Sequence, residues 1–516
     1  MSLRAKSVMV LGTTSGAGKS WLTTALCRWY ARQGLKVAPF KAQNMSNNAR
    51  VVAPTPGTGV SSLPSEGAAS CLGAARRQDM AGGEIGSAQY FQALAARAEP
   101  EVRMNPLLLK PERDTHSQVV LLGQVDEALS RLPWRGRSAR VWPQVAQALD
   151  ELRAENDVVV IEGAGSPAEI NLKDSDIVNM RVARHAGAGC LLVTDIDRGG
   201  AFAHLYGTWA LLPEDERALI RGFVLNKFRG DASLLAPAPE QLQALTGIPT
   251  VATLPMWWQH GLPEEDGVFD DRSTAAGAVR LTIAVIAYPR ISNLDEFQPL
   301  KNVPGVRLVW ARSPADCAGA GWLVLPGSKH TSGDLAWLRA QGLDRAVAAH
   351  AAEGRAVLGV CGGLQMLGEA LVDPHGIDGN GPGLGLLPLV TRFEPAKTVR
   401  RTTACFGALA PGPWQALSGV AVGGYEIHHG ATVQHVAMAP AREALAGGLG
   451  WQNPAGNVLG LYLHGLFEDP AVLQALFGAA VPTLDRVFDG LADYLDQHFQ
   501  PGFLASLLHS DRTPLP

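Results

Sequence analysis

The chain has 516 residues, 47% hydrophobic and 18% charged, and its 44 basic and 48 acidic side chains give a formal net charge of −4. This length predicts two or three domains, and the charge lacks the basic surplus typical of nucleic-acid binding. No apolar run approaches the roughly 18 residues of a membrane-spanning helix, and the N-terminal apolar stretch is too short for a secretory signal. The six cysteines are widely spaced, which argues against a disulfide scaffold or a zinc ribbon. We therefore expect a cytoplasmic protein with no nucleic-acid or membrane partner.

The first half of the chain alternates short apolar strands with helices, and the helix that follows the first strand spans Lys19–Gln33. Continuous apolar runs are typical of parallel strands covered on both faces. We assign residues 1–256 to one doubly wound α/β domain, interrupted by a mobile surface insertion at about 51–83, where Pro, Gly, Ser and Ala dominate. The strands are predicted at Ser7–Leu11, Lys36–Phe40, Val158–Glu162, Cys190–Thr194 and Gly222–Asn226.

A second strand–helix series follows a Pro- and acid-containing linker, which we place at residues 257–280. Two such series imply two doubly wound parallel-sheet α/β domains, and the second is assigned to residues 281–480. The remainder, 481–516, is predicted to be a helical extension with a helix at Leu484–Phe499. Strands of the second series are expected at Leu281–Ala287, Val306–Val309, Trp322–Leu325, Ala356–Val360 and Val458–Leu463.

A glycine-rich turn, GTTSGAGKS, lies between the first strand and the first helix. Backbone N–H groups of such a turn converge on phosphate oxygens, and the helix N-terminus adds partial positive charge. The spacing between the outer glycines is one residue longer than in the usual phosphate loop, but the GKS ending predicts a lysine on the β/γ-phosphates and a serine hydroxyl on Mg²⁺. The expected ATP-binding residues are Gly12, Thr13, Gly16, Ala17, Gly18, Lys19, Ser20 and, at the end of the second strand, Lys41.

Acidic side chains follow the carboxyl ends of later strands, where open α/β sheets place functional groups. Glu162 ends one apolar strand, so we predict that it joins Ser20 as a Mg²⁺ ligand or orients a water molecule. Further charged residues lie just beyond strand ends, and we predict substrate contacts for Asp176, Asp195, Asp197 and Arg198.

The second half contains LGVCGGLQMLG, in which a strand runs into Cys361 and two glycines before a helix. A nucleophile on such a tight turn is exposed and strained, and the helix N-terminus favours its thiolate. The proposed base is His464, at the end of the strand in GLYLHGLF. The oxyanion formed on attack needs backbone donors, and we assign these to Gly362 and to Gly327 or Ser328 in the turn LPGSKHT.

With these motifs the chain resembles the adenosylcobyric acid synthase family, whose members are glutamine-hydrolysing amide synthases of cobalamin biosynthesis. The N-terminal half is also similar to dethiobiotin synthetase, which shares the longer glycine spacing, and the C-terminal half resembles class I glutamine amidotransferases. The matching stretches cover nearly the whole chain in order: GTTSGAGKS, APFKAQNMS, RMNPLLLKP, IEGAGSPAEINLKDSDIVNM, DIDRGG, LNKFRGD, LPGSKHT, GVCGGLQMLG, GYEIHHG and YLHGLF.

The resemblance implies that four carboxylates (b, d, e and g) of adenosylcobyrinic acid a,c-diamide are amidated, each with one ATP and one glutamine. It implies ATP and Mg²⁺ as cofactors, small-molecule partners, and Gln365 as a glutamine-binding residue. Class I amidotransferases often carry a glutamate two residues after the histidine, where this chain has Leu466. Glu468 and Glu426 are candidates for that orienting role.

Two alternatives remain. Cobyrinic acid a,c-diamide synthase has the same two modules and acts on other carboxylates, although KAQNMS and RMNPLLLKP favour the first assignment. A partitioning-type ATPase switch usually has an extra lysine early in the phosphate loop, where this chain has Thr13 and Thr14, and has no use for a cysteine elbow.

Overall fold

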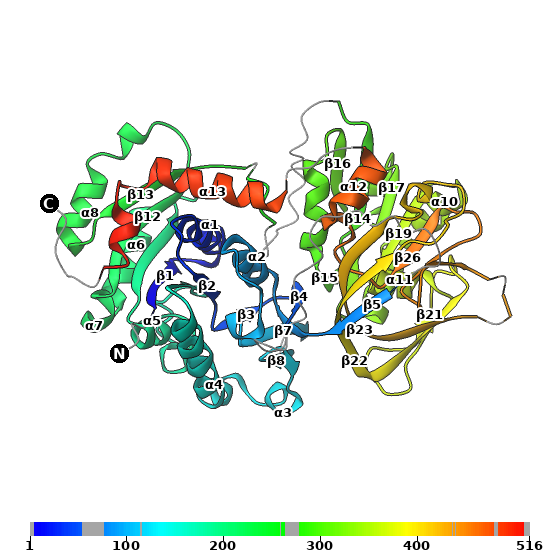
Figure 1. Ribbon diagram of the computed structural model, residues 1–516, viewed down its shortest axis with the longest axis horizontal. Helices are drawn as coiled ribbons and strands as arrows, with labels where there is room; N and C mark the ends of the chain where they lie inside the picture. Colours follow the sequence, from blue (N-terminus) through cyan, green and yellow to red (C-terminus); the bar gives the residue numbers. More distant parts are fainter. Residues whose placement is uncertain are drawn as a thin grey trace.

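The computed structural model describes residues 5–53, 77–113, 116–258, 260–263, 278–435, 437–438, 440–478 and 483–509. The N-terminal half (blue to green) and the C-terminal half (light green to orange) lie side by side in Figure 1. Each half is built on its own sheet of mainly parallel strands, as expected from the two strand–helix series. Within the described ranges, no helix combines the length and the apolar character needed to cross a membrane.

The N-terminal half contains a six-stranded sheet in the order β13-β12-β11-β1-β10-β2, and all five strand pairs are parallel. Separate apolar clusters cover its two faces, one containing Leu26 and the other Leu149, so the sheet is doubly wound as predicted. The strands are β1 Lys6–Gly12, β2 Val37–Phe40, β10 Val158–Glu162, β11 Gly189–Asp195, β12 Ile220–Phe228 and β13 Thr250–Pro255. The main helices of this half are α1 Lys19–Arg32, α2 Ser87–Ala95, α4 Trp134–Glu155, α5 Met180–Ala186, α6 Ala201–Leu211 and α8 Ala238–Thr246.

The C-terminal half is organised around a seven-stranded sheet in the order β16-β14-β17-β19-β26-β25-β24. Five strands are parallel, but β25 and β24 add an antiparallel edge that the sequence pattern did not predict. The strands are β14 Leu281–Ile286, β16 Val306–Ala311, β17 Trp322–Leu325, β19 Ala356–Val360, β24 Arg442–Leu445, β25 Gly450–Gln452 and β26 Val458–Leu461. The helices are α9 Thr331–Ala340, α10 Leu343–Ala352, α11 Gly362–Leu367 and α12 Pro470–Phe477.

Each half also contains smaller sheets. The long strands β22 (Leu389–Cys405) and β23 (Ala421–Gln434) form an antiparallel pair, and β20 (Ala370–Val372) with β21 (Gly381–Pro382) extends it. On the N-terminal side, β3 (Gln43–Met45), β7 (Leu107–Arg113), β8 (His116–Leu121) and β9 (Gln124–Val125) form another sheet.

The ends of the predicted insertion at 51–83 are ordered strands, which corrects that prediction. β4 (Ala49–Val52) pairs with β6 (Gly83–Gly86), and β5 (Arg77–Ala81) pairs antiparallel with β22 of the other half. Figure 1 shows β5 reaching from the N-terminal half to the edge of β22. The sequence hid these strands because each is short and lies beside a Pro/Gly-rich stretch. The middle of the predicted insertion, 54–76, lies outside the described residues.

The helix α13 (Leu484–His498) packs on the N-terminal half, although it follows the second domain in sequence. It lies along α1, as the orange-red helix over the dark blue one in Figure 1. Phe488, Leu491 and Leu495 are buried in this contact, and the buried Arg28 of α1 forms ion pairs with Asp485 and Asp489. The extension is therefore a structural part of the N-terminal half.

Candidate active sites

The phosphate loop connects β1 to α1 at the carboxyl edge of the first sheet. Gly18 has a φ of 95°, and a Cβ placed there would lie 2.1 Å from Nδ2 of Asn226, so only glycine fits. The Lys19 ammonium donates to the carbonyl oxygens of Thr14 (2.9 Å) and Gly165 (3.3 Å), and Thr13 Oγ1 donates to Thr194 Oγ1 at 2.9 Å. The loop residues predicted from the sequence are thus gathered around one turn.

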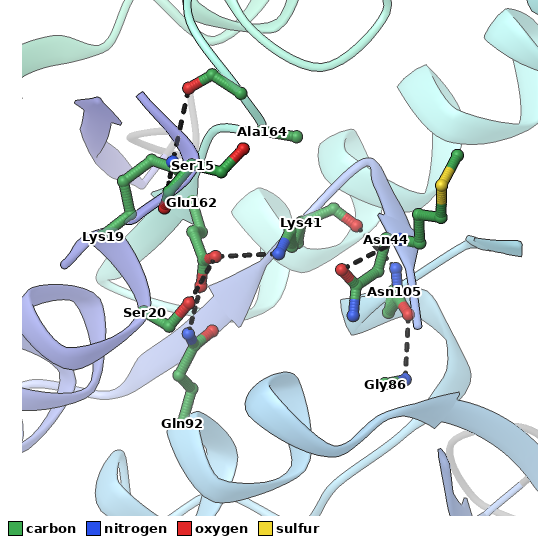
Figure 2. A network of polar contacts seen from close by, with 12 residues as sticks. Ser15, Lys19, Ser20, Lys41, Asn44, Gly86, Gln92, Asn105, Glu162 and Ala164 are labelled. Carbon is green, nitrogen blue, oxygen red and sulfur yellow. Dashed lines mark hydrogen bonds and ion pairs between the residues drawn. The ribbon is translucent and has the colours of Figure 1, made fainter. Parts of the chain in front are cut away.

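Glu162 is the centre of a buried polar network beside this loop, shown in Figure 2. Its Oε1 accepts hydrogen bonds from Ser20 Oγ and Lys41 Nζ, each at 2.8 Å, and its Oε2 accepts one from Gln92 Nε2 at 2.5 Å. Burial alone raises the pKa of the carboxyl, but Lys41 and the hydrogen bonds outweigh burial and hold the pKa of Glu162 below its ordinary value. The structure therefore keeps an ionised carboxylate beside a serine hydroxyl, and such hard oxygen donors suit Mg²⁺.

The sequence missed Gln92, because it lies on α2, far from any recognisable motif. It also missed the part played by Asn226 and Lys227 at the end of β12. Asn226 Nδ2 donates to the carbonyl oxygen of Ala17 at 2.9 Å, and Lys227 Nζ donates to that of Gly16 at 2.8 Å. Both side chains thereby hold the phosphate loop in shape.

Two of the predicted substrate contacts, Asp195 and Arg198, lie beside this same loop. Asp195 accepts from Lys227 at 3.2 Å and pairs with Arg198 at 3.5 Å, and the Arg198 guanidinium lies near Gly16. Asp197 is paired with Arg229. These residues lie on the nucleotide side of the half, and their contact with a second substrate stays a prediction.

Asp176 binds backbone N–H groups of the segment that leads into α5. Its Oδ1 accepts from the backbone N–H groups of Val178 and Asn179, at 2.8 and 3.0 Å, and its Oδ2 from that of Met180 at 3.2 Å. Met180 is the first residue of α5, so the carboxylate binds the first free N–H group of that helix and the two N–H groups just before it. A contact of Asp176 with a substrate stays a prediction.

In the second half, Cys361 lies on a strained turn between β19 and α11. Its φ of 51° and ψ of −106° are unusual for a residue with a side chain, as expected for a nucleophile elbow. A Cβ on Gly363 would lie 1.8 Å from the carbonyl oxygen of Leu325, so this turn requires glycine. The thiol lies 3.6 Å from the carbonyl oxygen of Ile427 on β23.

His464 follows β26, the strand adjacent to β19, and interacts with the Cys361 thiol. Its Nδ1 lies 2.9 Å from Oε1 of Glu296, whose Oε2 accepts from the backbone N–H of Gly465 at 2.8 Å. Because Nδ1 is engaged by the carboxylate, Nε2 is the nitrogen left to exchange a proton with the thiol. Burial lowers the pKa of His464, but Glu296 and Cys361 outweigh it and raise the pKa to about 10. The buried Glu296 carboxylate therefore favours the protonated form of the imidazole beside Cys361.

Glu296 replaces both glutamates that we considered for the orienting role. Glu468 instead pairs with Arg50, and Glu426 accepts from Arg400 Nε and Thr402 Oγ1, each at 2.7 Å. Glu296 lies in the 3₁₀ segment Leu294–Asn302, 168 residues before the histidine. The only available signal was an acidic pair, Asp295–Glu296, soon after an apolar strand.

The proposed oxyanion donors meet at the elbow. A Cβ on Gly362 would lie 2.8 Å from the backbone nitrogen of Ser328, and Gly327 lies against His464. Gln365 is buried behind this turn: its Oε1 accepts from Thr331 Oγ1 at 2.9 Å and its Nε2 donates to Tyr462 OH at 3.3 Å. The amide is thus engaged by protein groups, and its contact with glutamine stays a prediction.

Family models match both halves of the chain. Residues 8–263 match a CobQ/CobB/MinD/ParA nucleotide-binding domain, and residues 282–472 match a CobB/CobQ-like glutamine amidotransferase domain. Joined to a phosphate loop and a cysteine elbow, these matches define a glutamine-dependent amidating ligase that uses a nucleotide.

Relatives over the full length give the particular family. The chain is 76% identical to cobyric acid synthase of Variovorax paradoxus over 98% of its own length and 99% of the relative's. It is 73% identical to that of a Polaromonas species, with 98% of each chain covered. The chain belongs to the cobyric acid synthase family. A solved glutamine amidotransferase aligns over 41% of this chain and 98% of its own, at 18% identity and a TM-score of 0.27.

Proposed function

We propose that this protein amidates the b, d, e and g carboxylates of adenosylcobyrinic acid a,c-diamide to give adenosylcobyric acid, with one ATP and one glutamine for each amide. The observation that carries the proposal is the presence, in one chain, of the Cys361–His464–Glu296 set and of the phosphate loop with Glu162. One site suits release of ammonia, and the other suits activation of an acid.

The N-terminal half activates the carboxylate. A carboxylate oxygen is a poor leaving group, so the carboxylate attacks the γ-phosphorus of ATP, giving an acyl phosphate and ADP. Lys19 and the N–H groups of the loop stabilise charge on the phosphoryl group in transit. Ser20 and Glu162 would hold Mg²⁺, which neutralises phosphate charge when bound. Lys41 keeps Glu162 ionised for this role.

The C-terminal half releases ammonia from glutamine. The Cys361 thiolate attacks the carboxamide carbon, and the backbone N–H groups near Gly362 and Ser328 stabilise the resulting oxyanion. His464 donates its proton to the departing nitrogen, and the C–N bond breaks to leave a thioester and ammonia. His464 then takes a proton from water, which attacks the thioester and releases glutamate. Glu296 holds the imidazole in the required orientation throughout.

In the last step the nitrogen of ammonia attacks the carbonyl carbon of the acyl phosphate. The bond between that carbon and the bridging oxygen breaks, and inorganic phosphate leaves with the oxygen. The product is a primary amide, and the displaced proton goes to solvent or phosphate. Each cycle thus consumes one ATP and one glutamine and yields ADP, phosphate and glutamate.

The Cys361→Ala variant tests this division of labour. We expect it to lose amidation with glutamine and to retain amidation with a high concentration of ammonium. Counting amides by mass on the a,c-diamide and on unamidated cobyrinic acid identifies the substrate. Equal loss with both nitrogen donors, or no amidation of the a,c-diamide by the wild-type protein, would contradict the proposal.

A further inference from the structure

One arginine of the N-terminal half is buried inside the glutaminase site of the C-terminal half. Arg50 lies on β4, and its side chain is 1% exposed. Its guanidinium donates to the carboxylates of Asp295 and Glu468 and to the hydroxyl of Tyr425. All three acceptors belong to the C-terminal half, so the fork of Arg50 bridges three separate segments of that half.

Two of the three acceptors, Asp295 and Tyr425, adjoin the catalytic histidine or its carboxylate. Asp295 precedes Glu296 in the chain. The Tyr425 ring stacks on the imidazole of His464, with centroids 5.2 Å apart and an interplanar angle of 17°. The backbone of Tyr425 also accepts from the N–H of His464 at 2.9 Å. Arg50 therefore binds the tyrosine that stacks on the imidazole and the residue next to the carboxylate that orients it.

Residues next to Arg50 in the chain bind the segment that contains Asp295 and Glu296. The side chain of Asn48 accepts from the backbone N–H of Leu294 at 3.1 Å, and the side chain of Asn293 accepts from that of Ala49 at 2.9 Å. The amide nitrogen of Asn293 lies 3.3 Å from Nδ1 of His464. The segment that presents Glu296 is thus held by residues of the other half.

We propose that Arg50 is a positioning residue of the glutaminase, supplied by the synthetase half, which fixes Glu296 and His464 for work on Cys361. This rests on the proposed function. A guanidinium fork fits the role because it binds several oxygens in fixed directions, whereas a lysine offers a single flexible point charge. The site that releases ammonia is thus complete only when the two halves are docked.

The setting of Arg50 on its own side supports this role. Its guanidinium lies over the rings of Tyr90 and Phe91 of α2, at 5.8 and 5.2 Å from the ring centroids. The next residue of α2, Gln92, donates to Glu162 in the nucleotide site. The helix that supports Arg50 is therefore the same helix that contacts the predicted metal ligand.

The Arg50→Met variant tests the proposal, because methionine keeps much of the apolar stem and loses the fork. We expect the kcat of amidation with glutamine to fall at least about tenfold, while amidation with ammonium stays within about twofold of wild type. Alkylation of Cys361 by iodoacetamide, followed on its peptide by mass spectrometry, should move to higher pH by about one unit because the imidazolium is less well held. Arg50→Lys should recover only part of the loss.

Two further variants keep the test decisive. Arg401→Met removes another contact between the halves, the 3.0 Å pair with Glu99, which the structure leaves partly exposed, and should behave as wild type in all three assays. Tyr425→Phe removes only an acceptor of Arg50 and should lower the glutamine-dependent rate alone, which decides the matter if Arg50→Met does not fold. Equal losses with both nitrogen donors, or an unmoved alkylation profile, would overturn the proposal. Failure of the corrinoid amidation would overturn the proposed function instead, because the alkylation profile does not depend on it.

Discussion

Replacing Glu296 by glutamine tests the orientation of the catalytic histidine. The carboxylate accepts from His464 at 2.9 Å and from the backbone N–H of Gly465 at 2.8 Å. A glutamine has a single acceptor oxygen, so it satisfies one of these donors and turns an N–H₂ group toward the other. At least one charge-assisted hydrogen bond is lost in a site where both side chains are 1% exposed.

The expected magnitude follows from that bond. A hydrogen bond to a charged group contributes about 1.5–3 kcal/mol, and about 1.4 kcal/mol corresponds to a tenfold change in rate. Glu296→Gln should therefore lower the kcat of glutamine hydrolysis by roughly 10- to 150-fold. The loss of the carboxylate charge adds to this, because Glu296 helps to raise the pKa of His464 to about 10.

The assay is amidation with glutamine compared with amidation with ammonium. Only the glutamine-dependent rate should fall, since the nucleotide site is unchanged. Glu426→Gln is the matched control, because Glu426 accepts from Arg400 and Thr402 instead of His464 Nδ1, and it should cost less than about threefold. A loss of less than threefold in Glu296→Gln, or an equal loss with both donors, would refute the reasoning.

The nucleotide site, the His464–Glu296 pair and helix α13 can each be tested by a variant. Glu162→Gln should lower amidation at least about 100-fold with either donor and leave alkylation of Cys361 unchanged; activity near that of an Asp174→Asn control would count against the metal assignment. The folded-state pKa of His464, about 10, exceeds its unfolded value of about 6.5, so the pair with Glu296 stabilises the fold below that unfolded value and the stabilisation is lost as pH rises through about 10. In urea unfolding, the difference in free energy of unfolding between wild type and Glu296→Gln should shrink as pH rises from about 6.5 to about 10. A difference that widens over this range would contradict the role given to the pair. Ending the chain at residue 482 removes Phe488, Leu491 and Leu495, and burial of each contributes about 1.5–3 kcal/mol. The melting temperature of the N-terminal half should therefore drop strongly. Asp493→Asn is the control and should lower it far less, because it removes only the exposed ion pair with Arg32, which contributes under about 1 kcal/mol.

Local motifs could be predicted from the sequence because their chemistry depends on consecutive residues. The phosphate loop and the cysteine elbow each lie between a strand and a helix, and Glu162 follows the end of an apolar strand. Parallel strands bring such ends to one edge of the sheet, so the meeting of Ser20 with Glu162 could be anticipated.

Partners that come from distant segments could not be predicted. Glu296 lies in a 3₁₀ segment without a recognisable motif, and only the folded chain brings it to His464. Arg50 lies at the edge of a region that reads as a loop, because β4 and β5 are short and lie beside Pro- and Gly-rich sequence. The return of α13 to α1 was also hidden, since its amphipathic pattern predicts a helix but does not say which surface buries its apolar face.

The central claim is that nitrogen freed at Cys361 becomes the new amide on an acid activated beside Lys19. Supplying glutamine labelled with ¹⁵N in its side-chain amide, together with excess unlabelled ammonium, tests this transfer directly through the mass of the product. The account predicts that the corrinoid amides carry ¹⁵N well above its share of the free ammonium. Product amides with the isotopic composition of the bulk ammonium would contradict it.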